Sequence, residues 1–210
     1  MKKLKPALEA RGFEVAIFHA TGMGGMAFEQ IAKQGKFVCV MDFALPELGN
    51  LLAGSVINGG EDRMLSAGVA NIPQIIAPGC IDLIDFAGWQ KIPKKYSDRP
   101  FHEHNRLIKS SALNTEERRE TAREINFRLK KSEAPVHVIL PLRGIEEWDK
   151  IAGPAYDPDS LSAFMNEMKN SLKEPIGVTK IDNHINDEEF SLTVMKIFDN
   201  WVEQGIVLNK

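Results

Sequence analysis

The chain has 210 residues, of which 43% are hydrophobic, so it holds enough apolar material for one sizeable core. Its 26 basic and 29 acidic residues leave a formal net charge of -3, which excludes the strong positive field that nucleic-acid binding requires. No apolar stretch approaches the roughly 20 residues that span a bilayer, and no secretory signal is recognised. We therefore expect neither a nucleic-acid partner nor a membrane.

The sequence contains two cysteines. Cys39 lies inside an apolar run and Cys80 follows a glycine, a spacing that predicts neither disulfides nor a zinc site. Free cysteines of this kind are typical of a reducing compartment, so the sequence favours a cytoplasmic protein.

The first third of the chain alternates between helical and strand-like patterns. An amphipathic segment predicts a helix that ends at Gly12, where a left-handed cap is expected. The apolar run 13–18 predicts a strand, followed by the glycine-rich loop 19–25 and a second helix. Residues 37–41 predict another strand, and Pro46 suits the first turn of the next helix.

The middle of the chain interrupts this alternation. After a helix that ends near Gly68, residues 74–77 predict a strand. Periodicity is then lost over residues 78–103, which contain several glycines and prolines. A stretch of that length predicts a functional lid or binding loop.

Capping signals mark the last helices. Asn114 followed by Glu117 predicts a capping box for a helix that runs to about residue 131. Asp157 precedes a proline and a helical pattern, and Asn186 with Glu189 predicts the start of the terminal helix. Strands are predicted before the second and third of these helices, at residues 136–140 and 176–181.

The predicted fold class is α/β: a Rossmann-like, mainly parallel sheet with helices on both faces. Parallel strands need crossover connections, which the alternating helices supply. We expect residues 1–210 to form a single domain. Because the chain opens on a helix, whereas a doubly wound unit normally begins with a strand, a further element is expected upstream.

The best candidate for anion binding is the glycine-rich loop after the first predicted strand. His19, Thr21, Gly22, Gly24 and Gly25 lie at the start of a helix, where free N–H groups and the helix dipole favour phosphate or carboxylate. The spacing matches neither the dinucleotide fingerprint nor a P-loop. A tight turn that needs glycine only for its backbone angles is an equally good interpretation.

Other polar residues follow the remaining strands, where ligands of open α/β sheets bind. Asp42 could accept a hydrogen bond from a ligand hydroxyl or could cap the next helix. Gly79 and Asp82 would add backbone donors and a carboxylate. Arg143, followed by Gly144, offers a guanidinium for phosphate or carboxylate, with a surface arginine without specific contacts as the alternative.

Imidazoles and amides form the densest polar clusters. His102 and His104 would face the same way only in an extended segment. A metal site would then need a third ligand, and His184, after the last predicted strand, is the candidate. We favour histidines that hydrogen-bond within loops over a metal site, and predict no metal. The remaining ligand-binding candidates are Asn105, Asn186 and Asp187.

The order and spacing of these motifs resemble one family across nearly the whole chain: the plant tobamovirus-resistance protein and its bacterial and fungal relatives, an ATP-binding family. The motifs are residues 18–25, 62–63, 72–73, 78–79, 102–105 and 184–187. The resemblance implies a two-domain protein of which this chain matches the carboxy-terminal half, with the amino-terminal domain as a partner. It also implies ATP with Mg²⁺ as the cofactor.

Three functions follow as hypotheses. The first is a domain that binds a small anionic ligand, such as a nucleotide, at the glycine loop with help from Arg143. The second is a metabolic enzyme for a small carboxylate or carbonyl compound, with His19 or His184 as general acid or base and Asp82 or Asp187 orienting it. The third is a homo-oligomer that assembles through residues 78–103.

Overall fold

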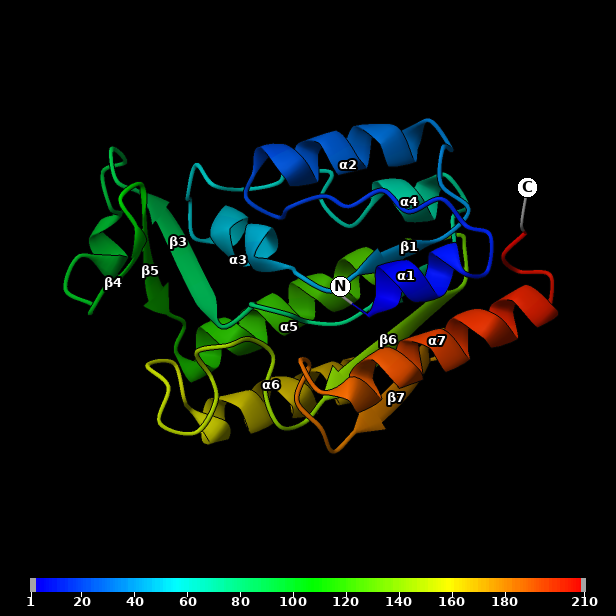
Figure 1. Cartoon of the computed structure of the whole chain (residues 1–210). Coiled ribbons are helices and arrows are strands. Elements are labelled where there is room, and N and C mark those ends of the chain that lie inside the picture. Colours follow the sequence, from blue (N-terminus) through cyan, green and yellow to red (C-terminus); the bar gives the residue numbers. More distant parts are fainter. Residues whose placement is uncertain (1–2, 209–210) are drawn as a thin grey trace.

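The computed structural model describes residues 3–208 and is built on a four-stranded parallel sheet (Figure 1). The strand order is β1 (Val40–Asp42), β2 (Gln74–Ile76), β6 (Val136–Pro141) and β7 (Gly177–Ile181). All three pairings are parallel. The predicted Rossmann-like α/β class is confirmed, and so are four of the five predicted strands.

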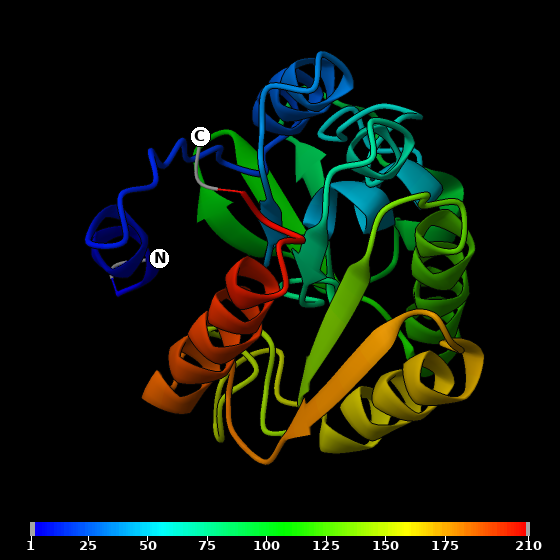
Figure 2. The same ribbon diagram turned by 90° about the vertical axis from the view of Figure 1, so that its right-hand side faces the viewer.

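Helices cover both faces of this sheet, as the view in Figure 2 shows. One face packs against α1 (Leu4–Glu9) and α7 (Glu188–Glu203), and the other against α5 (Thr115–Leu129) and α6 (Pro158–Ser171). Successive strand residues alternate between the two cores: Ile75 belongs to the α7 side and Ile76 to the α5 side. Among residues 3–208, no helix is long and apolar enough to cross a membrane.

Three further helices lie near the β1 end of the sheet. They are α2 (Met23–Lys33), α3 (Pro46–Leu52) and α4 (Ser66–Val69). Ala32 and Ala67 pack with Val40 of the edge strand, so α2 and α4 cover β1. Helix α3 follows β1 along the chain and lies beside a second, smaller sheet (Figure 1).

The second sheet is antiparallel and corrects a prediction. Its order is β3 (Leu83–Ala87), β5 (Ile108–Ala112) and β4 (His102–Asn105), with the 3-10 helix η1 (Lys94–Tyr96) beside it. Residues 78–103 are therefore not one long loop. Ile84 and Phe86 of β3 are buried in a small core with Tyr96, but surrounding glycines and prolines hide this strand from a reading of periodicity.

Residues 13–20, here called the strap, differ from the prediction of a strand over 13–18. The strap contains no assigned helix or strand. Its ends are held by aromatic contacts: Phe13 meets Phe198 edge-to-face with ring centroids 5.0 Å apart, and Phe18 lies against Phe28 and Phe37. Its composition is typical of a strand, but a strand also needs a neighbouring strand to hydrogen-bond with. Sequence periodicity does not show whether that neighbour is present.

The capping predictions are confirmed for two helices and wrong for the third. Asn114 and Glu117 form the reciprocal capping box of α5, and Asp157 accepts from the Ser160 N–H at the start of α6. At α7 the N-cap is Asp187, whereas the side chain of Asn186 donates to Glu147 at 3.2 Å. The N-cap therefore lies one position after the predicted one.

Candidate functional site

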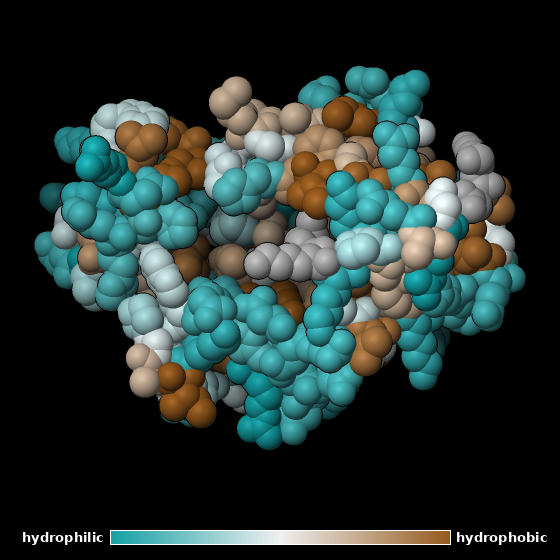
Figure 3. All heavy atoms as spheres, in the orientation of Figure 1, coloured by the Kyte–Doolittle hydropathy of each residue, from teal (hydrophilic) through white to brown (hydrophobic). Residues whose placement is uncertain are grey.

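A cleft of about 970 Å³ opens beyond the carboxyl end of β1, between the parallel sheet and the small sheet. Figure 3 shows a hollow near the centre of this face, bordered by both hydrophilic and hydrophobic residues. The walls come from segments far apart in the sequence: the strap, β1 and the start of α3, the segment 80–85, the β4–β5 hairpin, and the turns at 145–148 and 185–187.

The cleft brings together part of the predicted site. Two of the imidazoles, His19 and His104, line the same space although 85 positions separate them in sequence. The other candidates that line it are Thr21, Gly25, Asp42, Asn186 and Asp187. Loops after β1 and β7 and the hairpin thus meet here, while other candidates lie outside this lining.

The glycine-rich loop holds a carboxylate from its own chain. Glu47 Oε1 accepts from the backbone N–H of Gly22 at 2.5 Å and of Gly25 at 3.1 Å. Gly22 has a φ of +92°, and a Cβ on Gly25 would lie 2.0 Å from Glu47 Oε2, so both positions require glycine. The loop therefore has the predicted chemistry for an anion, with Glu47 as the anion it binds.

Arg63 joins this loop to the sheet. It is 2% exposed; its Nε donates to Glu47 Oε2 at 2.8 Å, and its two terminal nitrogens donate to Asp42, one of them at 3.0 Å. Glu29 lies 3.5 Å away and accepts from the backbone N–H of Met64 at 2.6 Å. We call Glu29, Asp42, Glu47 and Arg63 the arginine cluster.

Arg63 is the one cation of the arginine cluster and contacts all three of its carboxylates. Burial alone would lower the pKa of Arg63, but the three carboxylates raise it above its usual value. Burial raises the pKa of Glu29, although Ser66 and Arg63 oppose that shift. The cluster therefore keeps a permanent cation beside the glycine loop.

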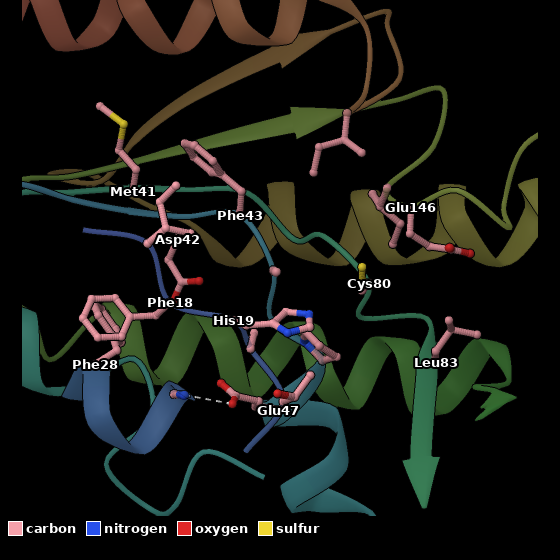
Figure 4. A pocket seen from close by; sticks show the side chains of 18 of the residues that line it. Phe18, His19, Phe28, Met41, Asp42, Phe43, Glu47, Cys80, Leu83 and Glu146 are labelled. Atoms are coloured by element: carbon pink, nitrogen blue, oxygen red, sulfur yellow. Dashed lines mark hydrogen bonds between the residues drawn. The ribbon is translucent and has the colours of Figure 1, made fainter. Parts of the chain in front are cut away.

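The opposite end of the cleft is acidic, and several of its carboxylate oxygens have no hydrogen-bond partner among the described residues. Figure 4 shows Phe18 and Phe28 at one end of the pocket and Cys80, Leu83 and Glu146 at the other. We call Cys80, Asp82, Asp85, Glu146 and Asp149 the acidic end. Burial and then the four carboxylates raise the pKa of Cys80, so its thiol stays protonated.

Two carboxylates of the acidic end have atoms without partners. Glu146 is 7% exposed and lines the cleft; its Oε2 accepts from the Trp148 N–H at 2.7 Å, but Oε1 has no hydrogen-bond partner among the described residues. Asp82 is fully buried behind the lining, and neither carboxylate oxygen has such a partner. Burial raises the pKa of Asp82 to about 7, although Arg118 opposes this.

An aromatic side chain lies at the mouth of the cleft. Trp148 lies 5.6 Å from His104 and 6.0 Å from His102, measured between ring centroids. Both imidazoles therefore meet the same indole, as expected for an extended segment. Only His104 and Trp148 of the three line the cleft.

His184 is held in place on both ring nitrogens. Its Nε2 lies 2.9 Å from the Glu146 carbonyl oxygen and 3.0 Å from Asp149 Oδ1, and its Nδ1 accepts from the Asn186 N–H at 3.0 Å. The ring also packs against Gly144, where a Cβ would lie 2.3 Å from it. These contacts suit a positioning role and leave no nitrogen free for a substrate proton.

Three further candidates serve local structure outside the cleft lining. Arg143 is exposed and pairs with Asp182, with Nε 2.7 Å from Oδ1. Asn105 accepts from the N–H groups of residues 107 and 108 in the hairpin turn. Gly79 approaches the Phe43 carbonyl so closely that a Cβ would lie 2.0 Å from its oxygen.

Sequence reasoning missed the residues that dominate the charge of the cleft. Glu47 and Arg63 meet across 16 positions, and Asp85 comes from the unpredicted strand β3. The acidic run after Gly144, which contains Glu146 and Trp148, was a usable signal because it follows a predicted strand. Within residues 3–208, no three histidine, cysteine or acidic side chains are grouped as metal ligands.

Comparison with known proteins identifies the family. Residues 1–202 match the model of the C-terminal domain of the uncharacterised protein family UPF0261. The chain belongs to this family. A UPF0261 protein of Brucella melitensis is 48% identical over 99% of the chain and 50% of its own length, and one of Clostridium tetani is 30% identical over 95% and 50%. The chain thus spans about half the length of these relatives.

The resemblance to the plant protein is also found. The ToMV resistance protein Tm-1 of Solanum lycopersicum is 29% identical over 93% of this chain and 26% of its own length. The ToMV susceptible protein of the same plant shows the same identity over the same coverage. The similarity therefore does not separate resistance from susceptibility, and ATP binding and homo-oligomer formation stay predictions.

Proposed function

We propose that this UPF0261 domain binds a nucleotide-sized small molecule in the cleft, with MgATP as the leading candidate. The observation that carries the proposal is the cleft itself: about 970 Å³, at the carboxyl end of β1, with polar side chains converging from separate segments. Its volume lies in the range of small-molecule sites, and its place is where open α/β sheets bind ligands.

Charge argues for the magnesium complex over the free nucleotide. Among the described lining residues, six carry carboxylates, namely Asp42, Glu47, Asp85, Glu146, Glu147 and Asp187, whereas only Lys3 and Arg63 are cationic. A free triphosphate would be repelled by this excess of negative charge. Mg²⁺ is commonly bound by one or two carboxylates together with water and phosphate oxygens, so it would enter with the nucleotide.

The remaining lining suits the neutral parts of a nucleotide. Trp148 and His104 at the mouth could stack on a base, and Asp85 could accept from a ribose hydroxyl. The glycine loop could take a phosphate only if Glu47 moved away from Gly22 and Gly25. We therefore place the phosphates with Mg²⁺ at the acidic end and not at the glycine loop.

Calorimetry on the full chain tests the proposal with ATP plus Mg²⁺, ATP plus a chelator, and adenosine. We expect saturable heat with MgATP and at least tenfold weaker binding without Mg²⁺. Asp85→Asn should weaken MgATP binding, whereas Asp98→Asn, at an exposed position outside the cleft, should not. Absence of heat from both MgATP and adenosine would overturn the proposal.

A further inference from the structure

The edge of the parallel sheet at β1 has free backbone groups. The Val40 N–H donates to the Pro73 carbonyl and the Asp42 carbonyl accepts from the Ala77 N–H, so both residues hydrogen-bond towards β2. In a parallel ladder, residues between such positions point their backbone groups the other way. Met41 therefore faces an edge that no described strand covers, whereas the Phe43 carbonyl beyond it lies against Gly79.

The strap lies opposite this edge, and most of its own amides are unpaired in the described part of the chain. Within residues 3–208, the amides of residues 14–20 donate to no described acceptor, although Phe13 and Thr21 on either side do. The strap is rich in β-branched and aromatic residues, and its side chains largely alternate between more and less exposed. Unpaired amides next to an unpaired strand edge are complementary surfaces.

A continuous gap separates the two segments. The main cleft and a second hollow of about 470 Å³ both lie between the strap and residues 36–43. They share one set of lining residues: Ala16, Phe37, Cys39, Met41 and Phe43. Cys39 and Met41, on either side of Val40, both belong to this set, so the gap runs along the edge strand.

We propose that the free edge of β1 is a docking surface for the chain's own residues 14–18, which add to the sheet as a fifth, parallel strand. Helix α2 connects the strap to β1, which is the crossover that a parallel pair requires. The same addition would fill the smaller hollow and the aromatic end of the main cleft, and leave the acidic end open.

Pairing would also complete the candidate site. With residues 14–18 in the sheet, His19 and Thr21 would follow a strand end directly beside Asp42, at the edge where ligands of such sheets bind. This consequence rests on the proposed function, whereas the strand pairing does not. The two ideas can therefore fail separately.

Cysteine scanning of the strap in the full chain tests the pairing without ligand. In a Cys80→Ser background, single cysteines at positions 14 to 18 are oxidised mildly and tested for a disulfide with the native Cys39. Side chains in a strand alternate between faces, so cross-linking should follow a period of two. Uniform or absent cross-linking at all five positions would overturn the proposal.

Hydrogen exchange gives an independent readout on the unmodified chain. Paired strap amides should exchange at least tenfold more slowly than in an unstructured peptide, at alternate positions. Ala16→Pro removes a donor at the centre of the strap, and should speed exchange at Met41 while the amides of β6 stay protected. Exchange of all strap amides at the unstructured rate would contradict the pairing.

Discussion

The arginine cluster and the acidic end both contain buried carboxylates, but the hydrogen bonding of these carboxylates differs between them. In the arginine cluster, the Arg63 side chain contacts three carboxylates and backbone N–H groups occupy their remaining oxygens. At the acidic end, Glu146 Oε1 and both oxygens of Asp82 have no partner among the described residues. The hydrogen bonding of the arginine cluster is complete without a ligand, and that of the acidic end is not.

This difference separates scaffold from site. Buried polar groups are normally hydrogen-bonded, so each exception needs an explanation such as water, an ion or a ligand. The arginine cluster fixes the glycine loop, β1 and α3 to one another. The acidic end supplies free oxygen atoms beside a cleft, which is why we place the magnesium side of MgATP there.

Removing the cation should break the arginine cluster. Arg63→Met leaves three buried carboxylates without their partner, which we expect to cost about 3–5 kcal/mol in the free energy of unfolding. Arg143→Met is the matched control, since Arg143 is exposed and its pair with Asp182 lies in solvent, so the loss of stability should be much smaller. Urea unfolding of both variants measures the difference, and equal losses would contradict the account.

The acidic end should make stability depend on pH. Because burial raises the pKa of Asp82 from 3.8 to about 7, the folded chain holds more protons than the unfolded chain between these values. Stability should therefore fall as pH rises from about 4 to 7, by at most about 4 kcal/mol from this group. Beyond about pH 7 its contribution should be level.

Asp82→Asn isolates that contribution. Glu29 and Glu146 also have raised pKa values and act in the same direction, so the wild-type slope alone does not identify Asp82. The difference in unfolding free energy between wild type and Asp82→Asn should change across this window and then level off. A difference that is independent of pH would show that Asp82 is ionised throughout.

A smaller effect should distinguish ligand binding from stability. Glu146→Gln keeps the shape of a side chain whose Oε1 is unpartnered, so stability should change by less than about 1 kcal/mol. MgATP affinity should fall about tenfold, or about 1.4 kcal/mol, because a carboxylate near the metal is lost. Glu133→Gln is the control, since Glu133 is exposed and lies outside the cleft lining. Equal affinities for the two variants would contradict our placement of Mg²⁺.

Local sequence patterns were enough to predict most of the fold. Helices with clear caps, such as the one that begins after Asn114, and apolar strands such as β6 followed from periodicity and turn chemistry. The strap and β3 were predicted wrongly for opposite reasons. The strap has strand composition without a paired neighbour, and β3 is paired and buried within a segment dominated by glycine and proline.

The site was less predictable because its charges meet only in three dimensions. Polar residues after strands correctly pointed to one edge, and His19, Asp42 and His104 do share a cleft. Nothing local shows that Glu47 occupies the glycine loop or that His184 is hydrogen-bonded on both nitrogens. Glu47 lies 22 and 25 residues from the glycines that bind it, and the two partners of His184 Nε2 lie 35 and 38 residues away.

Fluorescence of Trp148 tests the central claim most directly, because this indole lines the cleft while Trp89 and Trp201 do not. Titration with MgATP should give a saturable change in tryptophan emission in the wild-type chain, and Trp148→Phe should abolish it while the chain stays folded. An unchanged signal in that variant, or no signal in the wild type at millimolar MgATP, would contradict binding in this cleft.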